Sequence, residues 1–347
     1  SNDEGTSISV DGSGNVYITG LFWGTADFDP GAGAANLIST GNRDIFIQKS
    51  DASGNLLWAK SMGGTGNDFG HSISIDGFGN VYTTGYFADT VDFDPGTGAA
   101  SLISAGITDI FIQKLDASGN LLWAKRMGGS GNDFGHSISI DGFGNVYTTG
   151  YFADTVDFDP GTGAASLISA GITDIFIQKL DASGNLLWAK RMGGTSFDEG
   201  LSISVDGFGN VYTTGYFAGT VDFEPSVGTT NLSSNGGPDI FIAKYSQPVN
   251  INSIYNDAIT MKVFPNPSQG EFAVQCMGNG SAGFGSAHPP SLTGKIIVFN
   301  VLGEVVYQSA AIKQPVAGID LGSVPSGIYY LHIISTEQIV AMKILIE

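Results

Sequence analysis

A segment of 65 residues repeats through most of the chain, and it constrains the fold more than any other feature. The tetrapeptide Gly-Asn-Val-Tyr marks the repeat at positions 65 residues apart, beginning at Gly14, Gly79, Gly144 and Gly209. Residues 66–129 and 131–194 are identical at all 64 positions. A period of this length indicates a modular architecture in which each unit completes its core against its neighbours.

Within one repeat, short β-branched and aromatic runs alternate with clusters of Asp, Gly and Asn. The runs predict strands over residues 71–75, 81–87, 109–115 and 121–127. The clusters 76–80 and 116–120 predict tight turns. No window shows sustained helical periodicity. Four antiparallel strands per repeat predict an all-β fold, a β-propeller of four-stranded blades. A β-solenoid is the alternative fold, and we rank it second because the coils of a solenoid are shorter than this unit.

The repeats set the domain boundaries. We expect propeller units over residues 1–65, 66–130, 131–195 and 196–245. The fourth unit has Ser253 where the others have tryptophan, so it is incomplete. The opening residues 2–5 align with 67–70, inside the pattern. We therefore expect an N-terminally truncated ring of four visible blades, with a signal peptide in a missing upstream portion.

Tryptophan occupies one position of each complete unit, as Trp58, Trp123 and Trp188. Large aromatic side chains usually serve a core. We expect Trp123, with Leu122 and Met127, to pack between blades.

The repeat motifs resemble those of the bacterial β-propeller family called SBBP repeats. The shared motifs are Asp-Gly-x-Gly-Asn-Val-Tyr-x-Thr-Gly, Asp-Ile-Phe-Ile-x-Lys and Asp-Ala-Ser-Gly-Asn-Leu-Leu-Trp-Ala-Lys. The resemblance covers about residues 1–245 and implies a propeller, but it implies no ligand.

The chain is strongly acidic, with 33 Asp and Glu against 14 Lys and Arg and a net charge of −19. This charge argues against nucleic acid as a partner, since a polyanion would be repelled. The sequence contains no run of apolar residues long enough for a transmembrane helix. Its one cysteine, Cys276, excludes an intrachain disulfide.

An acidic motif in the long insert 88–108 is the one candidate for a metal site. Strand parity places this insert and its equivalents on one rim of the propeller, opposite the two turns. Closely spaced carboxylates suit Ca²⁺, although the motif supplies fewer ligands than the usual six to eight. We favour a role in forming turns. The calcium candidates are Asp27, Asp29, Asp92, Asp94, Asp157, Asp159, Asp222 and Glu224.

The sequence shows no catalytic motif. His71 and His136 recur, but the fourth repeat has Leu201 instead. Paired carboxylates would suit a glycosidase by residue type alone. Because the repeats are identical, any such pair has a twin, whereas catalytic pairs need unlike environments. We therefore expect no catalytic residues. We assign no cofactor, and Ca²⁺ is the one candidate.

Residues 246–261 read as a linker, and residues 262–347 read as a small β-sandwich of about seven strands. This module resembles the type A C-terminal sorting domain of type IX secretion, found in Bacteroidetes. The resemblance rests on five motifs in order, with an insert at 280–290 that departs from the family. The residues it assigns to the sorting signal are Pro265, Asn266, Pro267, Gly270, Gly303, Gly327, Tyr329 and Lys343.

These observations predict a secreted or cell-surface propeller that serves as a binding or scaffold module. The resemblance implies the type IX secretion machinery as a partner, and we expect a glycan or a surface protein as ligand. The competing hypothesis is a secreted polysaccharide-active enzyme, a glycosidase or lyase on a propeller scaffold.

Overall fold

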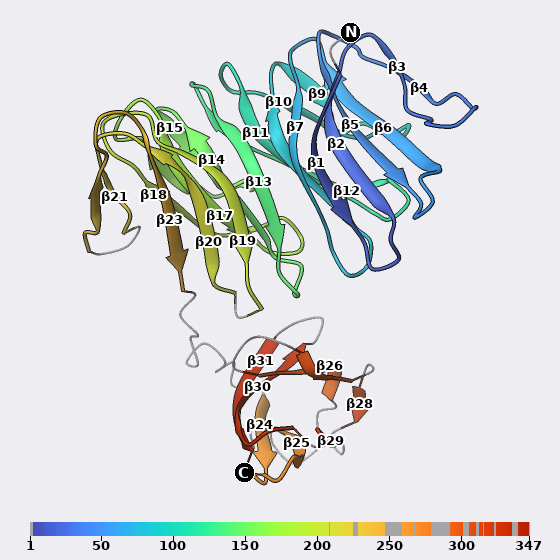
Figure 1. Cartoon of the computed structure of the whole chain (residues 1–347), viewed down its shortest axis with the longest axis vertical. Coiled ribbons are helices and arrows are strands. Elements are labelled where there is room, and N and C mark those ends of the chain that lie inside the picture. The colour runs from blue at the N-terminus through green and yellow to red at the C-terminus, as the bar shows by residue number, and fades with distance from the viewer. Residues whose placement is uncertain are drawn as a thin grey trace. The chain divides into compact units, whose positions relative to one another are not determined.

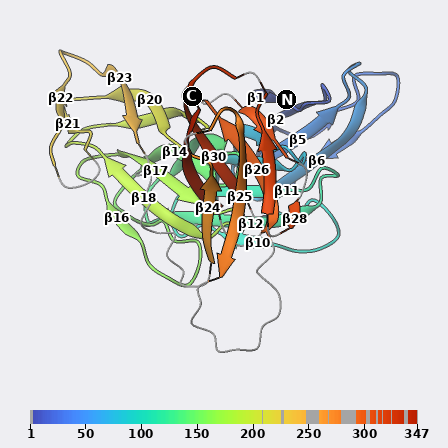
Figure 2. The ribbon, with the colours of Figure 1, turned by 90° about the horizontal axis from the view of Figure 1, so that it is seen from below.

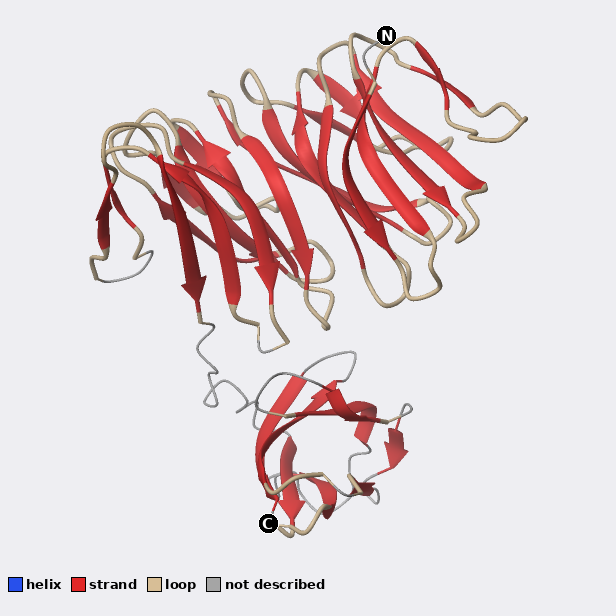
Figure 3. Cartoon of the chain, in the orientation of Figure 1, coloured by secondary structure: helices blue, strands red, loops and turns tan. Residues whose placement is uncertain are grey.

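A computed structural model describes residues 3–207, 209–224, 228–246, 259–266, 268–278, 292–300, 305–309, 312–314, 316–322, 324–334 and 339–346. These residues form strands and turns, with no helix among them (Figure 3). The chain divides into two compact units, Ser1–Ser246 and Gln247–Glu347. Each unit is described by itself.

Each of the first three repeats forms an antiparallel sheet of four long strands, and the repeats follow one another through the first unit (Figure 1). The all-β propeller architecture predicted from the sequence is confirmed. The strands are β1 Glu4–Val10, β2 Val16–Phe22, β5 Asp44–Ser50 and β6 Leu56–Gly64; β7 Phe69–Ile75, β8 Val81–Phe87, β11 Asp109–Leu115 and β12 Leu121–Gly129; β13 Phe134–Ile140, β14 Val146–Phe152, β17 Asp174–Leu180 and β18 Leu186–Met192. The fourth repeat contributes β19 Glu199–Val205, β20 Val211–Phe217 and β23 Asp239–Tyr245.

The long insert of each repeat holds a short hairpin, which the sequence analysis did not foresee. The hairpins are β3 Thr25–Asp27 with β4 Asn36–Ile38, β9 Thr90–Asp92 with β10 Ser101–Ile103, β15 Thr155–Asp157 with β16 Ser166–Ile168, and β21 Thr220–Asp222 with β22 Asn231–Ser233. Strand β9 pairs with the end of β6, where Gly63 faces Asp92. Strand β15 pairs with β12 in the same way. The hairpins of the second and third repeats therefore extend the sheet of the preceding repeat, whereas β3–β4 and β21–β22 form separate two-stranded sheets.

The Asp-x-x-Gly-Asn turns are held by their own first side chain. Asp76 Oδ1 accepts hydrogen bonds from the backbone amides of Phe78 and Asn80, both 2.9 Å long. Its Oδ2 accepts from Asn80 Nδ2 at 2.7 Å and from the hydroxyl of Tyr82 at 3.0 Å. Gly79 has a φ of +80°, which favours glycine. The Asp76 carboxylate and the positive φ of Gly79 together explain why Asp, Gly, Asn and Tyr recur in this motif.

The apolar core lies between neighbouring sheets. The first of these clusters joins Tyr17, Ile45 and Met62 of the first repeat to Val81, Phe87 and Phe111 of the second. Burying each such side chain contributes about 1.5–3 kcal/mol. Equivalent clusters fill the next two junctions.

Trp123 packs against the cluster between the second and third repeats, together with buried Met127. Its Nε1 donates to the carbonyl of Ala182 in the next repeat at 3.3 Å, and Lys114 Nζ donates to the same oxygen at 3.3 Å. The prediction that Leu122 packs here was wrong. Its side chain is 51% exposed, because it lies on the opposite face of β12 from Trp123 and Leu121.

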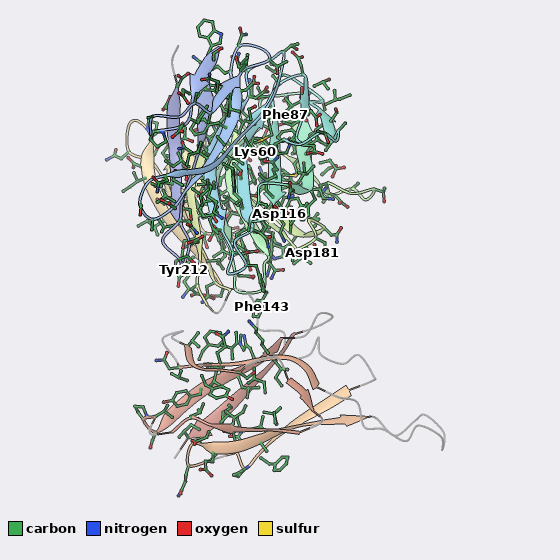
Figure 4. The ribbon with its side chains drawn as sticks, turned by 90° about the vertical axis from the view of Figure 1, so that its right-hand side faces the viewer. Lys60, Phe87, Asp116, Phe143, Asp181 and Tyr212 are labelled. Carbon is green, nitrogen blue, oxygen red and sulfur yellow. The ribbon has the colours of Figure 1, made fainter. Side chains whose placement is uncertain are left out.

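The two ends of the propeller unit carry different loops. Figure 4 shows Phe87, the last residue of β8, toward one end, and Phe143 and Asp181, in the Asp-x-x-Gly-Asn turns, toward the other. The insert hairpins and the links between repeats lie at the first end, called here the insert end. Hairpin β21–β22 lies at the margin of the unit in Figure 2, and Asp222 bridges Gly193 beyond β18.

The second unit is a sandwich of two antiparallel sheets. One contains β24 Ile259–Phe264, β25 Glu271–Gly278 and β29 Val316–Asp320; the other contains β26 Leu292–Phe299, β27 Val305–Gln308, β28 Ile312–Gln314, β30 Gly327–Ile334 and β31 Ile339–Ile346. Phe272 and Ile319 of the first sheet pack against Val298 and Leu331 of the second. The predicted linker 246–261 and the insert 280–290 lie mostly or wholly outside the described residues.

Candidate binding pocket at the junction of the first two repeats

A surface pocket of about 300 Å³ lies at the insert end, between the first and second repeats. It is lined by Trp23, Asn42, Arg43 and Asn67. Trp23 directly follows β2, Asn42 and Arg43 directly precede β5, and Asn67 directly precedes Asp68 and β7. Because adjacent strands are antiparallel, the end of β2 and the starts of β5 and β7 meet at one end of the unit.

The pocket floor is fixed by the backbone. Arg43 and Asn67 form an isolated parallel bridge, in which the carbonyl of Arg43 accepts from the amide of Asp68 at 2.9 Å. The amide of Trp23 donates to Asp3 Oδ1 at 3.0 Å. The indole itself is 52% exposed, which is unusual for so large an apolar group. The backbone therefore holds an open aromatic surface beside a cation.

Arg43 differs from the other two arginines of the chain. Arg126 and Arg191 form ion pairs with Asp109 and Asp174. Arg43 forms no ion pair with any described residue, and its guanidinium carbon lies 5.2 Å from the centre of the Phe69 ring. A cation held over an aromatic face keeps its hydrogen-bond donors free for a ligand.

The next junction of the propeller carries different side chains at the positions of Trp23 and Arg43. Ala88 and Thr108 stand where the first repeat has Trp23 and Arg43, and Thr108 Oγ1 lies 3.1 Å from Asn132 Oδ1. The motifs that the repeats share do not indicate Trp23, Asn42 or Arg43, because these residues occur in the first repeat alone. The sequence signal that could have indicated the pocket is the small set of positions at which the first repeat differs from the later repeats.

Buried aspartates lie near the pocket and its equivalents. One aspartate begins the third long strand of each complete repeat: Asp44, Asp109 and Asp174. Another directly precedes the first strand of the next repeat: Asp68, Asp133 and Asp198. All six are buried, and burial raises the pKa of each. The pKa reaches about 7 at Asp68 and at Asp133. These carboxyls bind backbone amides, as Asp68 does with Gly64 and Ala88, so they hold loops together.

The calcium candidates also serve backbone amides. Asp92 Oδ1 accepts from the amides of Asp94 at 3.0 Å and Ala100 at 2.8 Å, and Asp94 Oδ1 accepts from Gly96 at 2.8 Å. The same bonds recur in the first and third repeats. Within the described residues, no three His, Cys, Asp or Glu side chains lie close enough to share a metal ion. Calcium binding stays an untested alternative to the turn-forming role.

His71 and His136 come together, although they are far apart in sequence. Their ring centroids lie 5.1 Å apart, between the second and third repeats. The Nε2 atom of each is buried without a hydrogen-bond partner. Burial lowers the pKa of both, to about 4 for His136, so both rings stay neutral at pH 7. Among the described residues, the two histidines are not part of any group of three His, Cys, Asp or Glu side chains that could hold a metal ion.

Several residues of the expected sorting signal meet at strand β31. Asn266 Oδ1 accepts from the amide of Leu345 at 2.9 Å, and Gly327 faces Ile346 across the sheet. The carbonyl of Gly270, whose φ is +100°, accepts from Leu321. The hydroxyl of buried Tyr329 donates to the carbonyl of Pro325 at 2.7 Å. Lys343 lies in β31; Pro267 and Gly303 lie outside the described residues.

Antiparallel blades that share strands with their neighbours define a β-propeller repeat protein, here joined to a separate sandwich. Comparison with protein families identifies both parts. Residues 1–28, 57–86 and 122–151 match the beta-propeller repeat family, SBBP. Residues 262–347 match the secretion system C-terminal sorting domain. These segments carry the SBBP repeat and the sorting domain, and the SBBP and type IX assignments made from the sequence are confirmed.

Two curated proteins are similar to the chain. An uncharacterized WD repeat-containing protein, L264 of Acanthamoeba polyphaga mimivirus, is 27% identical over 248 residues, 62% of this chain and 18% of the relative. Regulatory protein FlaEY of Caulobacter vibrioides is 25% identical over 293 residues, 80% of this chain and 30% of the relative. The chain thus spans less than a third of either relative.

The sorting domain supports secretion or cell-surface localisation of the propeller, and it supports interaction with the type IX secretion machinery. Among the described residues, no helix is long and apolar enough to cross a membrane.

Proposed function

We propose that the protein is an exported binding module whose propeller holds a glycan at the Trp23–Arg43 pocket, while its sandwich directs type IX secretion. The pocket carries the proposal. An indole, a free guanidinium and two amides gather at one junction of repeats that are otherwise nearly uniform. Ligand sites typically combine apolar surface with a few placed polar groups, in pockets of about 300–1,000 Å³.

The alternative, a polysaccharide-active enzyme, has less support. A glycosidase needs two carboxyls that reach the substrate. The paired aspartates beside the pocket are fully buried, and the same pairs recur at the next two junctions. Their bonds to loop amides fit a structural role.

The test of binding uses the full chain and a panel of bacterial and plant polysaccharides. All four tryptophans of the chain lie in the propeller, so tryptophan fluorescence reports on this unit. We expect Trp23→Ala to abolish glycan binding. Phe78→Ala is the matched control, because Phe78 is 82% exposed but lies in a turn at the opposite end. Equal binding by both variants would rule out the pocket; hydrolysis or elimination products would support the enzyme alternative.

The test of export compares the full chain with one that lacks residues 262–347, in a cell with type IX secretion. We expect the truncated chain to accumulate in the periplasm while the full chain reaches the surface. Equal surface delivery of both chains would show that another segment directs export.

A further inference from the structure

We infer that the Trp23–Arg43 pocket binds a carboxylated sugar, a hexuronate unit of an acidic polysaccharide. This inference rests on the proposed glycan-binding function and specifies its ligand. Arg43 carries it, since its guanidinium has no ion pair among the described residues and faces the pocket beside an exposed indole. Guanidinium groups bind carboxylates through two parallel hydrogen bonds.

The other pocket residues suit a pyranose ring. One face of a pyranose presents C–H groups, which can stack on the exposed indole of Trp23. The ring's hydroxyls need donors and acceptors, and each side-chain amide supplies both. Asn42 and Asn67 are both exposed at the pocket wall. A carboxylate on the same ring would complete the contacts at Arg43.

The net charge of −19 makes such binding specific rather than general. An acidic polysaccharide is repelled by most of this surface, so it cannot be retained by ion exchange. Asp44 and Asp68 beside the pocket are buried, and Asp3 Oδ1 accepts a hydrogen bond from the backbone amide of Trp23. A carboxylated ligand must therefore use one local cation.

The structure also predicts the stoichiometry. At the second junction Thr108 and Asn132 are in direct contact, and Ala88 replaces the indole. Ile107 replaces Asn42. The pocket's residue set therefore occurs once in the propeller, and we expect one hexuronate site per chain.

The experiment compares an oligogalacturonate with the same oligosaccharide after chemical reduction of its carboxyls, by calorimetric titration of the full chain. We expect the oligogalacturonate to bind with one site per chain and the reduced sugar at least tenfold more weakly. Arg43→Gln should weaken oligogalacturonate binding about tenfold or more, which corresponds to about 1.4 kcal/mol. It should change binding of the reduced sugar less than twofold. Trp23→Ala should abolish binding of both.

A second variant removes the risk of misfolding. Trp23→Ala with Asn42→Ile and Arg43→Thr gives the first junction the residues that the second already has. This variant should fold like the parent and bind neither sugar. Equal affinity of the parent for both sugars would overturn the carboxylate inference and leave glycan binding intact. Retention of oligogalacturonate binding by the triple variant would overturn the pocket itself, and with it the proposed function.

Discussion

Arg126 Nη1 lies 2.6 Å from Asp109 Oδ2, so an arginine side chain that is 35% exposed neutralises a fully buried carboxylate. Gly128 makes this packing possible, because a Cβ there would stand 2.1 Å from the Asp109 carboxyl carbon. The third repeat repeats the pair with Arg191 and Asp174. The first repeat has Ser61 at the arginine position, so its equivalent Asp44 is buried without this partner.

Ser61→Arg is therefore expected to stabilise the propeller. A charge-assisted bond to a buried carboxylate contributes about 1–3 kcal/mol. Urea unfolding followed by tryptophan fluorescence measures the change. Arg126→Ser is the matched reverse variant and should destabilise by a similar amount. A shift of both variants in the same direction would contradict the prediction.

Asp68 and Asp133 should make stability fall as pH rises. Burial raises the pKa of both to about 7, against 3.8 in the unfolded chain, so the folded state holds more protons between these values. Stability is therefore lost as pH increases from about 4 to about 7, and the loss is complete above that. Hydrogen bonds from Asn120 lower the pKa of the turn residue Asp116, and the stability that this residue contributes is lost only as pH falls below 3.8.

His71 and His136 have the opposite effect, so that they make the stability rise as pH increases. Burial lowers the pKa of both rings below the ordinary value of 6.5, and the unfolded chain therefore binds more protons there. A comparison with the double variant Asp68→Asn, Asp133→Asn removes this effect, since both proteins contain the histidines. Relative to the parent, the variant should gain on the order of 2–4 kcal/mol per site between pH 5 and pH 8. Parallel pH profiles of unfolding free energy would show that the carboxyls titrate normally.

Asp92 should act as a turn former. Asp92→Ala removes the acceptor of two backbone amides and should cost about 1–3 kcal/mol, whereas Asp92→Asn keeps one acceptor oxygen and should cost less. Titration of the metal-stripped chain with millimolar calcium should give no saturable heat and no change in melting temperature. If calcium instead gave a saturable heat, and Asp92→Asn lowered the number of calcium ions bound per chain by one, the calcium sites would be established.

Asn266→Ala should impair export. The amide of Leu345 would lose its acceptor, which weakens the attachment of β31 by about 1 kcal/mol. We expect less protein at the surface of a type IX-competent cell, measured by protease accessibility. Glu271→Gln, at an exposed position of β25, is the control. Normal delivery of the alanine variant would show that the secretion machinery does not require this contact.

Much of the propeller could be predicted because its local signals agree. Strand Val81–Phe87 begins directly after one Asp-x-x-Gly-Asn turn and strand Asp109–Leu115 ends directly before the other, as expected. The hairpin β9–β10 was missed because its strands are three residues each and pair with the preceding repeat. Such pairing depends on how neighbouring repeats stack, which no local pattern expresses.

The candidate site was harder to predict than the fold. The carboxylates of Asp92 and Asp94 stood out because they recur, yet both bind the backbone of their own turn. Trp23 and Arg43 do not recur, and their proximity arises only when two strand ends meet at one junction. Repetition therefore indicated structure, and departures from it indicated the pocket.

The identity of residues 66–129 and 131–194 has an evolutionary consequence. Removal of residues 66–130 by unequal recombination would place Thr65 directly before Gly131, and the new neighbour would carry the same sequence as the old one. Asn132 would then face Arg43 as Asn67 does now. The gene can thus gain or lose whole units of this kind without creating an untried interface, and the array can change its length while the pocket is inherited intact.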